Sequence, residues 1–333
     1  MRWQTQERYL RQMLARQLDI PILGKIVFAV ASGSATSAYE EYLRREMDIP
    51  AELLFSGALA PLNAYNSLSA YRNDVMLVFP GAYLLTAELA WAKVQTHMVG
   101  MGGPNIGGDF SESNTVLYTQ TADVASVLTV TGQNSQFHNL IIENDKDDAD
   151  NLTAATIAIY GTRWKNVAFH GHMEATQNTT VAAASLYITG AGMYPLLEDC
   201  IIGQSVWGIR SGALSGVLRF TSAGRPNGGI FKRCKFLSYS NTVTCAMIAV
   251  PTGTFIGRDW NFEQCSFRND NPDYGTKLNQ VFYLEPTGLQ KNVITLKDCA
   301  AFGFDAWDDG NAANVLSDMA VPAVTGGLGI EPT

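Results

Sequence analysis

The sequence predicts a mainly β protein, a parallel β-helix (solenoid) with a short α-helical N-terminal region. Short β-type runs that end near a glycine recur about every 30 residues, which is the period of stacked structural units. The runs begin at Val127, Ile157, Leu186, Val217, Met247 and Val281. A second string follows each run: an aromatic residue or leucine, any residue, a polar residue, then cysteine or an aliphatic residue. No helical pattern lies between the runs, which excludes an ordinary α/β sheet.

Four of the five cysteines occupy one position of this second string, at spacings of 34, 31 and 34 residues. Equivalent residues of successive coils stack about 4.8 Å apart in a solenoid. We therefore expect two interior ladders. The cysteine ladder comprises Leu140, Val167, Cys200, Cys234, Cys265 and Cys299. The aromatic ladder comprises Phe137, Trp164, Leu197, Phe231, Phe262 and Leu296.

The position just before the cysteine ladder is polar in every unit. This column contains Asn139, Asn166, Asp199, Arg233, Gln264 and Asp298. Asn and Asp tolerate left-handed backbone conformations and hydrogen-bond their own backbone. We place the column at the corner where one face of each coil turns into the next.

The cysteines have two interpretations. Neighbouring coils would bring their sulfurs close enough for a disulfide, but equivalent cysteines in a row are typical of a packed apolar ladder. The odd number of cysteines, with no C-x-x-C or Cys/His spacing, argues against a disulfide framework and against a zinc site. We expect buried thiols.

Composition limits the partners and the location. The 333 residues carry a net charge of −8, which argues against sequence-independent binding to nucleic acid. No apolar run reaches the ~20 residues that a membrane-spanning helix needs. The N-terminus lacks an apolar signal core with a cleavage site. We expect a protein made in a host cytoplasm, not exported by the usual signal, and without a nucleic-acid or membrane partner.

The chain divides into three expected regions: an N-terminal helical and strand arm with a cap (1–60), the parallel β-helix (61–308) and an extended C-terminal tail (309–333). The tail is small, apolar and turn-rich, which favours a segment laid along a neighbouring subunit over a disordered one.

The N-terminal third contains three helical patterns and one strand. Apolar residues recur at helical spacing in 5–19 and 34–47, a proline opens a third pattern at 61–71, and 25–30 reads KIVFAV. The first helix has two interpretations. It caps the open end of the stack, where strand edges are unpaired, or it docks onto a partner protein.

The segment 73–104, NDVMLVFPGAYLLTAELAWAKVQTHMVGMGGP, carries a family resemblance. Its D-x-Φ-x-Φ-x-P-G-x-Y string is similar to the first coil of the pectate-lyase-like right-handed β-helix superfamily. The resemblance covers roughly 61–305 and implies a right-handed coil, but the scaffold carries unrelated activities. With a helical N-terminus and no export signal, the chain resembles virion proteins of tailed phages. That resemblance implies a homotrimer on the capsid exterior, bound to the major capsid protein or other virion proteins.

The catalytic strings of β-helix enzymes are not recognisable. The acidic loop 145–150 is oxygen-rich, as calcium sites are, but a solvated loop is the commoner interpretation. A second acidic cluster lies at 305–309. His170 and His172 form an HGH string similar to one in polygalacturonases, yet the accompanying Asp motifs are missing, so we assign them to a polar loop. We expect no catalytic residue, no metal, no cofactor and no enzymatic activity.

Two functions compete at this point. The first is a structural component of a phage virion, a capsid-decorating or reinforcing protein. The alternative is a tailspike-type polysaccharide depolymerase or a glycan-binding adhesin. Aromatic residues near loops suit either sugar stacking or a subunit interface, and half of them are expected to be core residues. They are Trp207, Tyr239, Trp260, Tyr274 and Trp307.

Overall fold

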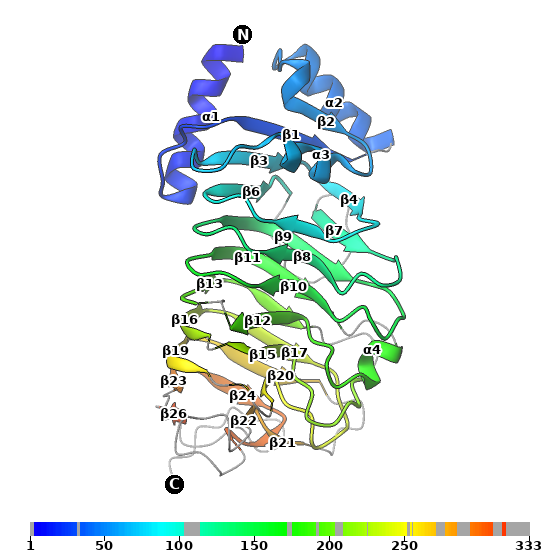
Figure 1. Ribbon diagram of the computed structural model, residues 1–333, viewed down its shortest axis with the longest axis vertical. Helices are drawn as coiled ribbons and strands as arrows, with labels where there is room; N and C mark the ends of the chain where they lie inside the picture. The colour runs from blue at the N-terminus through cyan, green and yellow to red at the C-terminus, as the bar shows by residue number, and fades with distance from the viewer. Residues whose placement is uncertain are drawn as a thin grey trace.

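The computed structural model shows stacked coils along one long axis, with the N-terminal helices at one end and the C-terminus at the other (Figure 1). It describes residues 3–31, 34–102, 114–171, 175–190, 193–203, 209–224, 226–251, 254, 256–270, 277–284, 294–308 and 315–317. The predicted right-handed parallel β-helix is confirmed, because the strands of successive coils pair in parallel into a 17-stranded sheet, a 7-stranded sheet and a 2-stranded sheet.

The largest sheet forms two faces of each coil. Its strands are β1 (Ile26–Val30), β2 (Leu54–Ser56), β3 (Asp74–Val78), β4 (Gly81–Leu84), β6 (Thr96–Gly100), β7 (Thr115–Thr119), β9 (Gln136–Asn144), β11 (Arg163–His170), β13 (Leu196–Glu198), β14 (Ile201–Gly203), β16 (Asn227–Lys232), β17 (Lys235–Ser238), β19 (Gly257–Glu263), β20 (Ser266–Asn269), β23 (Ile294–Lys297), β24 (Ala300–Phe302) and β26 (Val315–Ser317).

The other two sheets complete the coils. The 7-stranded sheet contains β5 (Leu89–Trp91), β8 (Ser126–Val130), β10 (Thr153–Ile157), β12 (Leu186–Gly190), β15 (Leu218–Gly224), β18 (Ile248–Val250) and β22 (Phe282–Leu284). The 2-stranded sheet contains β21 (Leu278–Gln280) and β25 (Phe304–Ala306). The described helices are α1 (Trp3–Leu18), α2 (Ser34–Arg45), the 3-10 helix η1 (Ala51–Leu53), α3 (Ala60–Ser67) and α4 (Ala175–Thr179).

The corner column bends the largest sheet. All six of its residues have left-handed φ values between 52° and 56°, so the predicted corner is confirmed. Asn166 donates a side-chain hydrogen bond of 2.9 Å to Asn139 on the preceding coil. Arg233 and Gln264 also take this conformation, which costs a side chain with a Cβ about 1–2 kcal/mol. The coil geometry therefore imposes the bend even where the residue does not favour it.

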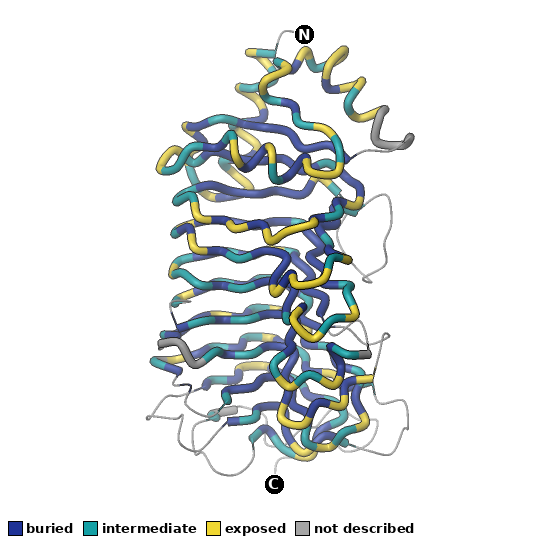
Figure 2. Tube along the Cα trace, turned by 45° about the vertical axis from the view of Figure 1, so that its right-hand side comes forward, coloured by how far each residue is buried: buried dark blue, intermediate teal, exposed yellow. Residues whose placement is uncertain are grey.

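Both ladders lie in the interior. Phe137 and Trp164 pair in register and stack at 4.1 Å between ring centroids, and Phe231 and Phe262 stack at 4.8 Å. Every member of the two ladders is at most 2 % exposed. In Figure 2 the buried stretches recur from coil to coil along the stack.

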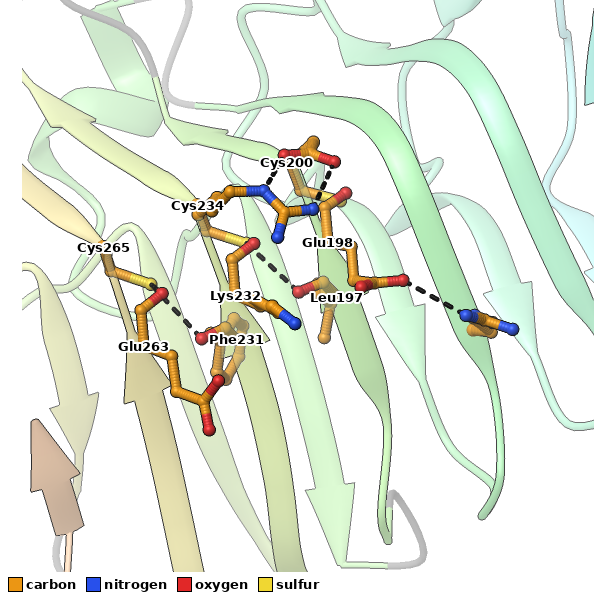
Figure 3. A network of polar contacts seen from close by, with 11 residues as sticks. Leu197, Glu198, Cys200, Phe231, Lys232, Cys234, Glu263 and Cys265 are labelled. Atoms are coloured by element: carbon orange, nitrogen blue, oxygen red, sulfur yellow. Dashed lines mark hydrogen bonds and ion pairs between the residues drawn. The ribbon is translucent and has the colours of Figure 1, made fainter. Parts of the chain in front are cut away.

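The five cysteines are free thiols. Cys234 donates to the carbonyl oxygen of Leu197 on the preceding coil at 3.4 Å, and Cys265 donates to that of Phe231 at 3.4 Å (Figure 3). Burial raises the pKa of Cys234 well above its ordinary value. The thiols are thus neutral, hydrogen-bonded core groups, and their chemistry is that of a small apolar side chain.

The N-terminal helices α1 and α3 pack against different parts of the coils. α1 buries Leu10, Leu14 and Leu18 against the outer face of β1, β3 and β6, in an apolar cluster separate from the interior. α3 contributes Ala64 and Tyr65 to the interior core itself. Thus α1 packs within the chain on the side of the coils, and α3 closes the first coil. The apolar stripe of α1 is narrower than its sequence suggests, because Met13 is 39 % exposed.

Membrane insertion through a helix finds no support in the described part of the chain. None of the helices there combines the length and the apolar character that a bilayer crossing requires.

Two substitutions at Cys234 in the cysteine ladder should lower the free energy of unfolding by different amounts. Cys234→Ala should lower the free energy of unfolding by roughly 1–2 kcal/mol, because it removes apolar burial and leaves a small void. Cys234→Asp should prevent folding, because an unpaired charge would lie in the interior. Denaturant unfolding followed by circular dichroism measures both, with Lys235→Ala at the exposed neighbouring position as the control. A stable Cys234→Asp variant would contradict the inward orientation.

Candidate functional site

Charged residues of alternating sign line the outer face of each coil before the corner. We call Lys165, Glu198, Lys232, Glu263 and Lys297 the charged column. They stand in register on β11, β13, β16, β19 and β23. Part of the column is visible in Figure 3, beside the cysteines that follow these strands just after the corner. The sequence places opposite charges at these positions because like charges on adjacent strands repel.

Two ion pairs flank the charged column. Arg163 lies 3.3 Å from Glu198 on the next coil. Arg233 binds both carboxylate oxygens of Asp199, at 2.6 and 2.8 Å. This hydrogen bond lowers the pKa of Asp199. Both residues of the second pair are about two-fifths exposed, so each pair contributes under about 1 kcal/mol to folding.

A buried acid–histidine pair lies on the outer face after the corner. Glu143 on β9 and His170 on β11 are neighbours in register. The Nδ1 atom of His170 lies 3.4 Å from Oε2 of Glu143, and the two residues are 4 % and 1 % exposed. Burial raises the pKa of Glu143, and the contact with His170 partly opposes that rise. A carboxyl in such surroundings can exchange a proton nearer neutrality than an ordinary glutamate does.

The other oxygen of Glu143 is buried and has no hydrogen-bond partner among the described residues. Tyr118 precedes Glu143 in the same outward column. Beside them Val116, Ile141 and Ala168 form a small buried apolar cluster. Burial, a coupled histidine and an unsatisfied oxygen together are the usual marks of a functional group, although structural pairs also have perturbed pKa values.

Two carboxylates of the predicted acidic loop meet a third one, from Asp123, at the surface. Asp123, Asp148 and Asp150 place one oxygen each within 4.8 Å of one another. Asp147 accepts a 2.8 Å hydrogen bond from the backbone of Thr176. Asp123 and Asp150 are exposed, as acidic groups commonly are without an ion. The arrangement offers the oxygen ligands that calcium prefers, but it is not a preformed buried cage.

Two further histidines lie beneath the end of α1. His97 on β6 accepts a hydrogen bond from the backbone of Gln136 at 3.2 Å. His138 on β9 lies 3.2 Å from the side-chain oxygen of Gln136, whose amide donates to the carbonyl of Leu18 in α1. Burial lowers the pKa of His97 to about 3 and that of His138 to about 4. Sequence reasoning missed this cluster, because the helix that covers it lies far away in the chain.

The aromatic residues considered as exposed anchors are buried or half-buried where the structure describes them. Trp260 is 1 % exposed and Trp307 is 8 % exposed, so these two belong to the part of the set that was expected in the core. Tyr239 is half-buried. Trp207 and Tyr274 lie outside the described residues, as do His172 and Asp309. The aromatics belong inside because flat rings stack well on successive coils.

Comparison with solved structures finds similar chains at low identity and low TM-score. A pectin methylesterase from Erwinia chrysanthemi aligns with 12% sequence identity and a TM-score of 0.44, over 87% of this chain and 92% of that one. Pectate lyase Pel9A aligns with 12% identity and a TM-score of 0.40, over 87% and 81%. ORF18 of Geobacillus virus E2 aligns with 11% identity and a TM-score of 0.32, over 78% and 56%. No protein-family model and no curated protein matches the sequence.

These matches overturn one expectation. The absence of a familiar catalytic string led to the prediction that the chain is not an enzyme. Pectin methylesterases and a pectate lyase are enzymes with coils of this kind. The prediction that the chain is not an enzyme is therefore withdrawn, since the missing strings do not mark it as inactive.

The buried histidines predict acid sensitivity. Their pKa values are lower in the folded chain than the ~6.5 of an unfolded histidine, so the unfolded chain takes up protons first as the pH falls. The free energy of unfolding should therefore decrease from about pH 6.5 down to about pH 4. Denaturant midpoints measured across this range for the natural chain and for His97→Asn/His138→Gln test it. Equal slopes for the two proteins would contradict the assignment.

Proposed function

We propose that this chain is a rigid β-helix component of a bacteriophage virion, either a capsid-decorating protein or a tailspike-like one. The observation that supports this most is the uninterrupted stack of coils around two dry interior ladders. A body of this kind resists proteolysis and bending, because opening any coil unpairs backbone groups on both sides. Such a part suits the outside of a particle.

The proposal assigns attachment to the N-terminal end. The helices there expose Tyr9 (63 %) and Tyr42 (53 %), and the segment after α1 exposes Leu23 (73 %). Exposed apolar groups gathered at one end suit contact with another protein. The partner would be the major capsid protein or another virion protein, and the coils would project outward.

Labelling of native particles tests the proposal. Antibody raised against the folded chain should decorate virions released by bacteria that carry this gene, at regular positions on the capsid or tail in electron micrographs. Antibody pre-adsorbed with the pure chain is the control. Purified particles that lack the chain by mass spectrometry would refute the virion role.

A second candidate, a polysaccharide-processing function, is favoured by the Glu143–His170 pair. Glycoside cleavage needs a carboxyl held in its acid form near a second carboxylate. Asp145 lies two residues along the chain from Glu143, raises its pKa and is bonded by the amide of Gln120 at 3.0 Å. Because Glu143 is buried, this function requires that a bound glycan uncover it.

This second candidate predicts a specific loss. Incubation with bacterial capsular polysaccharide or lipopolysaccharide should yield new reducing or unsaturated ends, measured by a colorimetric assay. Glu143→Gln should reduce the rate by at least about 100-fold, because the proton donor is removed. Glu198→Gln, on the other outer face, should leave the rate unchanged. No release from any of the polysaccharides would remove this candidate and leave the virion role untouched.

A further inference from the structure

On the outer face before the corner, the outward side chains form columns that are arranged symmetrically about the middle of the face. The charged column alternates in sign along β11, β13, β16, β19 and β23. A second outward column lies two residues earlier on the same strands. Its central members, Leu196 and Ile230, are neighbours in register on β13 and β16. Ile230 is 38 % exposed, so apolar surface lies open at the middle of a charged face.

We propose that this face binds a second copy of the same chain, with the two coil stacks antiparallel. The two-fold axis would run along the strands and pass between β13 and β16. It sets Glu198 against the partner's Lys232 and Lys165 against the partner's Glu263. Four of the five rungs of the charged column then meet the opposite charge, and Lys297 lies at the end of the paired region.

The neighbouring columns have the same centre of symmetry. The axis sets Leu196 against the partner's Ile230, so that apolar surface meets apolar surface. In the corner column it sets Asp199 against the partner's Arg233. At the centre of the face, all three columns thus set complementary side chains against each other about one axis. An apolar centre with a polar surround is the usual anatomy of a protein interface.

The charges of the column are largely free for such a partner. On this face of the described chain, the ion pairs are Arg163–Glu198 and Arg233–Asp199. Lys165, Lys232, Glu263 and Lys297 therefore have no ion pair with another described residue of the face. Among the described residues, α1 covers the outer face only over β1, β2, β3 and β6, and it does not reach the strands of the charged column.

The charge pattern also selects against the parallel arrangement. If two copies paired on this face with their coil stacks parallel and equivalent coils side by side, Lys232 would oppose the partner's Lys232. Glu198 would likewise oppose the partner's Glu198. Like charges opposed at every rung disfavour that pairing. The homotrimer expected from the family resemblance would therefore have to form through another face.

The interface is small, so the affinity should be modest. Five rungs span about 20 Å along the stack, and three columns cover a narrow strip across it. A patch of this size falls in the class of weak or transient contacts. Because its outer pairs are exposed, salt should weaken it.

Sedimentation equilibrium tests the proposal directly. The natural chain should dimerise at tens of micromolar in low salt and dissociate in about 0.5 M salt. Ile230→Glu should weaken dimerisation at least about tenfold, because it places a carboxylate in the apolar centre. Val243→Glu, at a residue of similar exposure (41 %) outside this face, is the matched control and should dimerise normally.

Variants with exchanged charges distinguish this interface from other possible interfaces. Lys232→Glu should weaken the dimer about tenfold by opposing the partner's Glu198. The double variant Glu198→Lys/Lys232→Glu should restore dimerisation, because the central pair is complementary again. Circular dichroism melting confirms that each variant is folded.

Zero-length carbodiimide cross-linking of mixed ¹⁴N- and ¹⁵N-labelled protein supplies the orientation. Lys165 and Glu263 lie three rungs apart in one chain, about 14 Å, so an amide between their side chains should join two chains. Mass spectrometry should find this mixed-isotope link, and Lys165→Arg should abolish it. A chain that stays monomeric to about 200 µM, or equal weakening by Val243→Glu and Ile230→Glu, would overturn the proposal. It stands independently of the virion role.

Discussion

The in-register parallel pairing of successive coils is the constraint on which the rest of this structure depends. It stacks each residue about 4.8 Å from its equivalent on the next coil. A side chain is then tolerated only if it packs against others at its own position. Inside, that favours thiols and flat rings, such as Cys234 beside Cys265 and Phe231 on Phe262. Outside, it favours alternating charge, because identical charges at this spacing repel.

The left-handed corner divides the outside of the stack into two faces that differ in burial. Before the corner, the outward columns are half-exposed and carry charge. After it, the outward columns around Ile141 and Glu143 are buried. Neighbouring strands therefore place the exposed Lys165 of β11 and the buried Glu143 of β9 on different outer faces of the same stack. Their electrostatics differ because burial, and not residue type alone, determines how a charge is stabilised.

The sequence predicted what repeats and missed what occurs once. The period identified the coils, both ladders and the corner, since each appears six times in the chain. α1 was located by its apolar spacing, but its position on the outside of β3 depends on packing over a long sequence separation. His97 and His138 gave no signal, because each is defined by the residues that cover it. His170 was assigned to a polar loop, and that was wrong: it ends β11 and is buried beside Glu143. For the same reason the sequence did not show which of the aromatics near turns, such as Trp260, lie in the interior.

A scaffold of this kind separates rigidity from activity. The side chains of the interior columns pack against one another, so a substitution there changes stability without creating a functional site. Functional groups must then project outward, and the corner distributes them between two faces of the same coil. A second copy bound along the charged column would cover Glu198 and Lys232 but not the face that holds Glu143. Assembly and chemistry therefore do not compete for surface on this chain, and evidence for one of them is no evidence against the other.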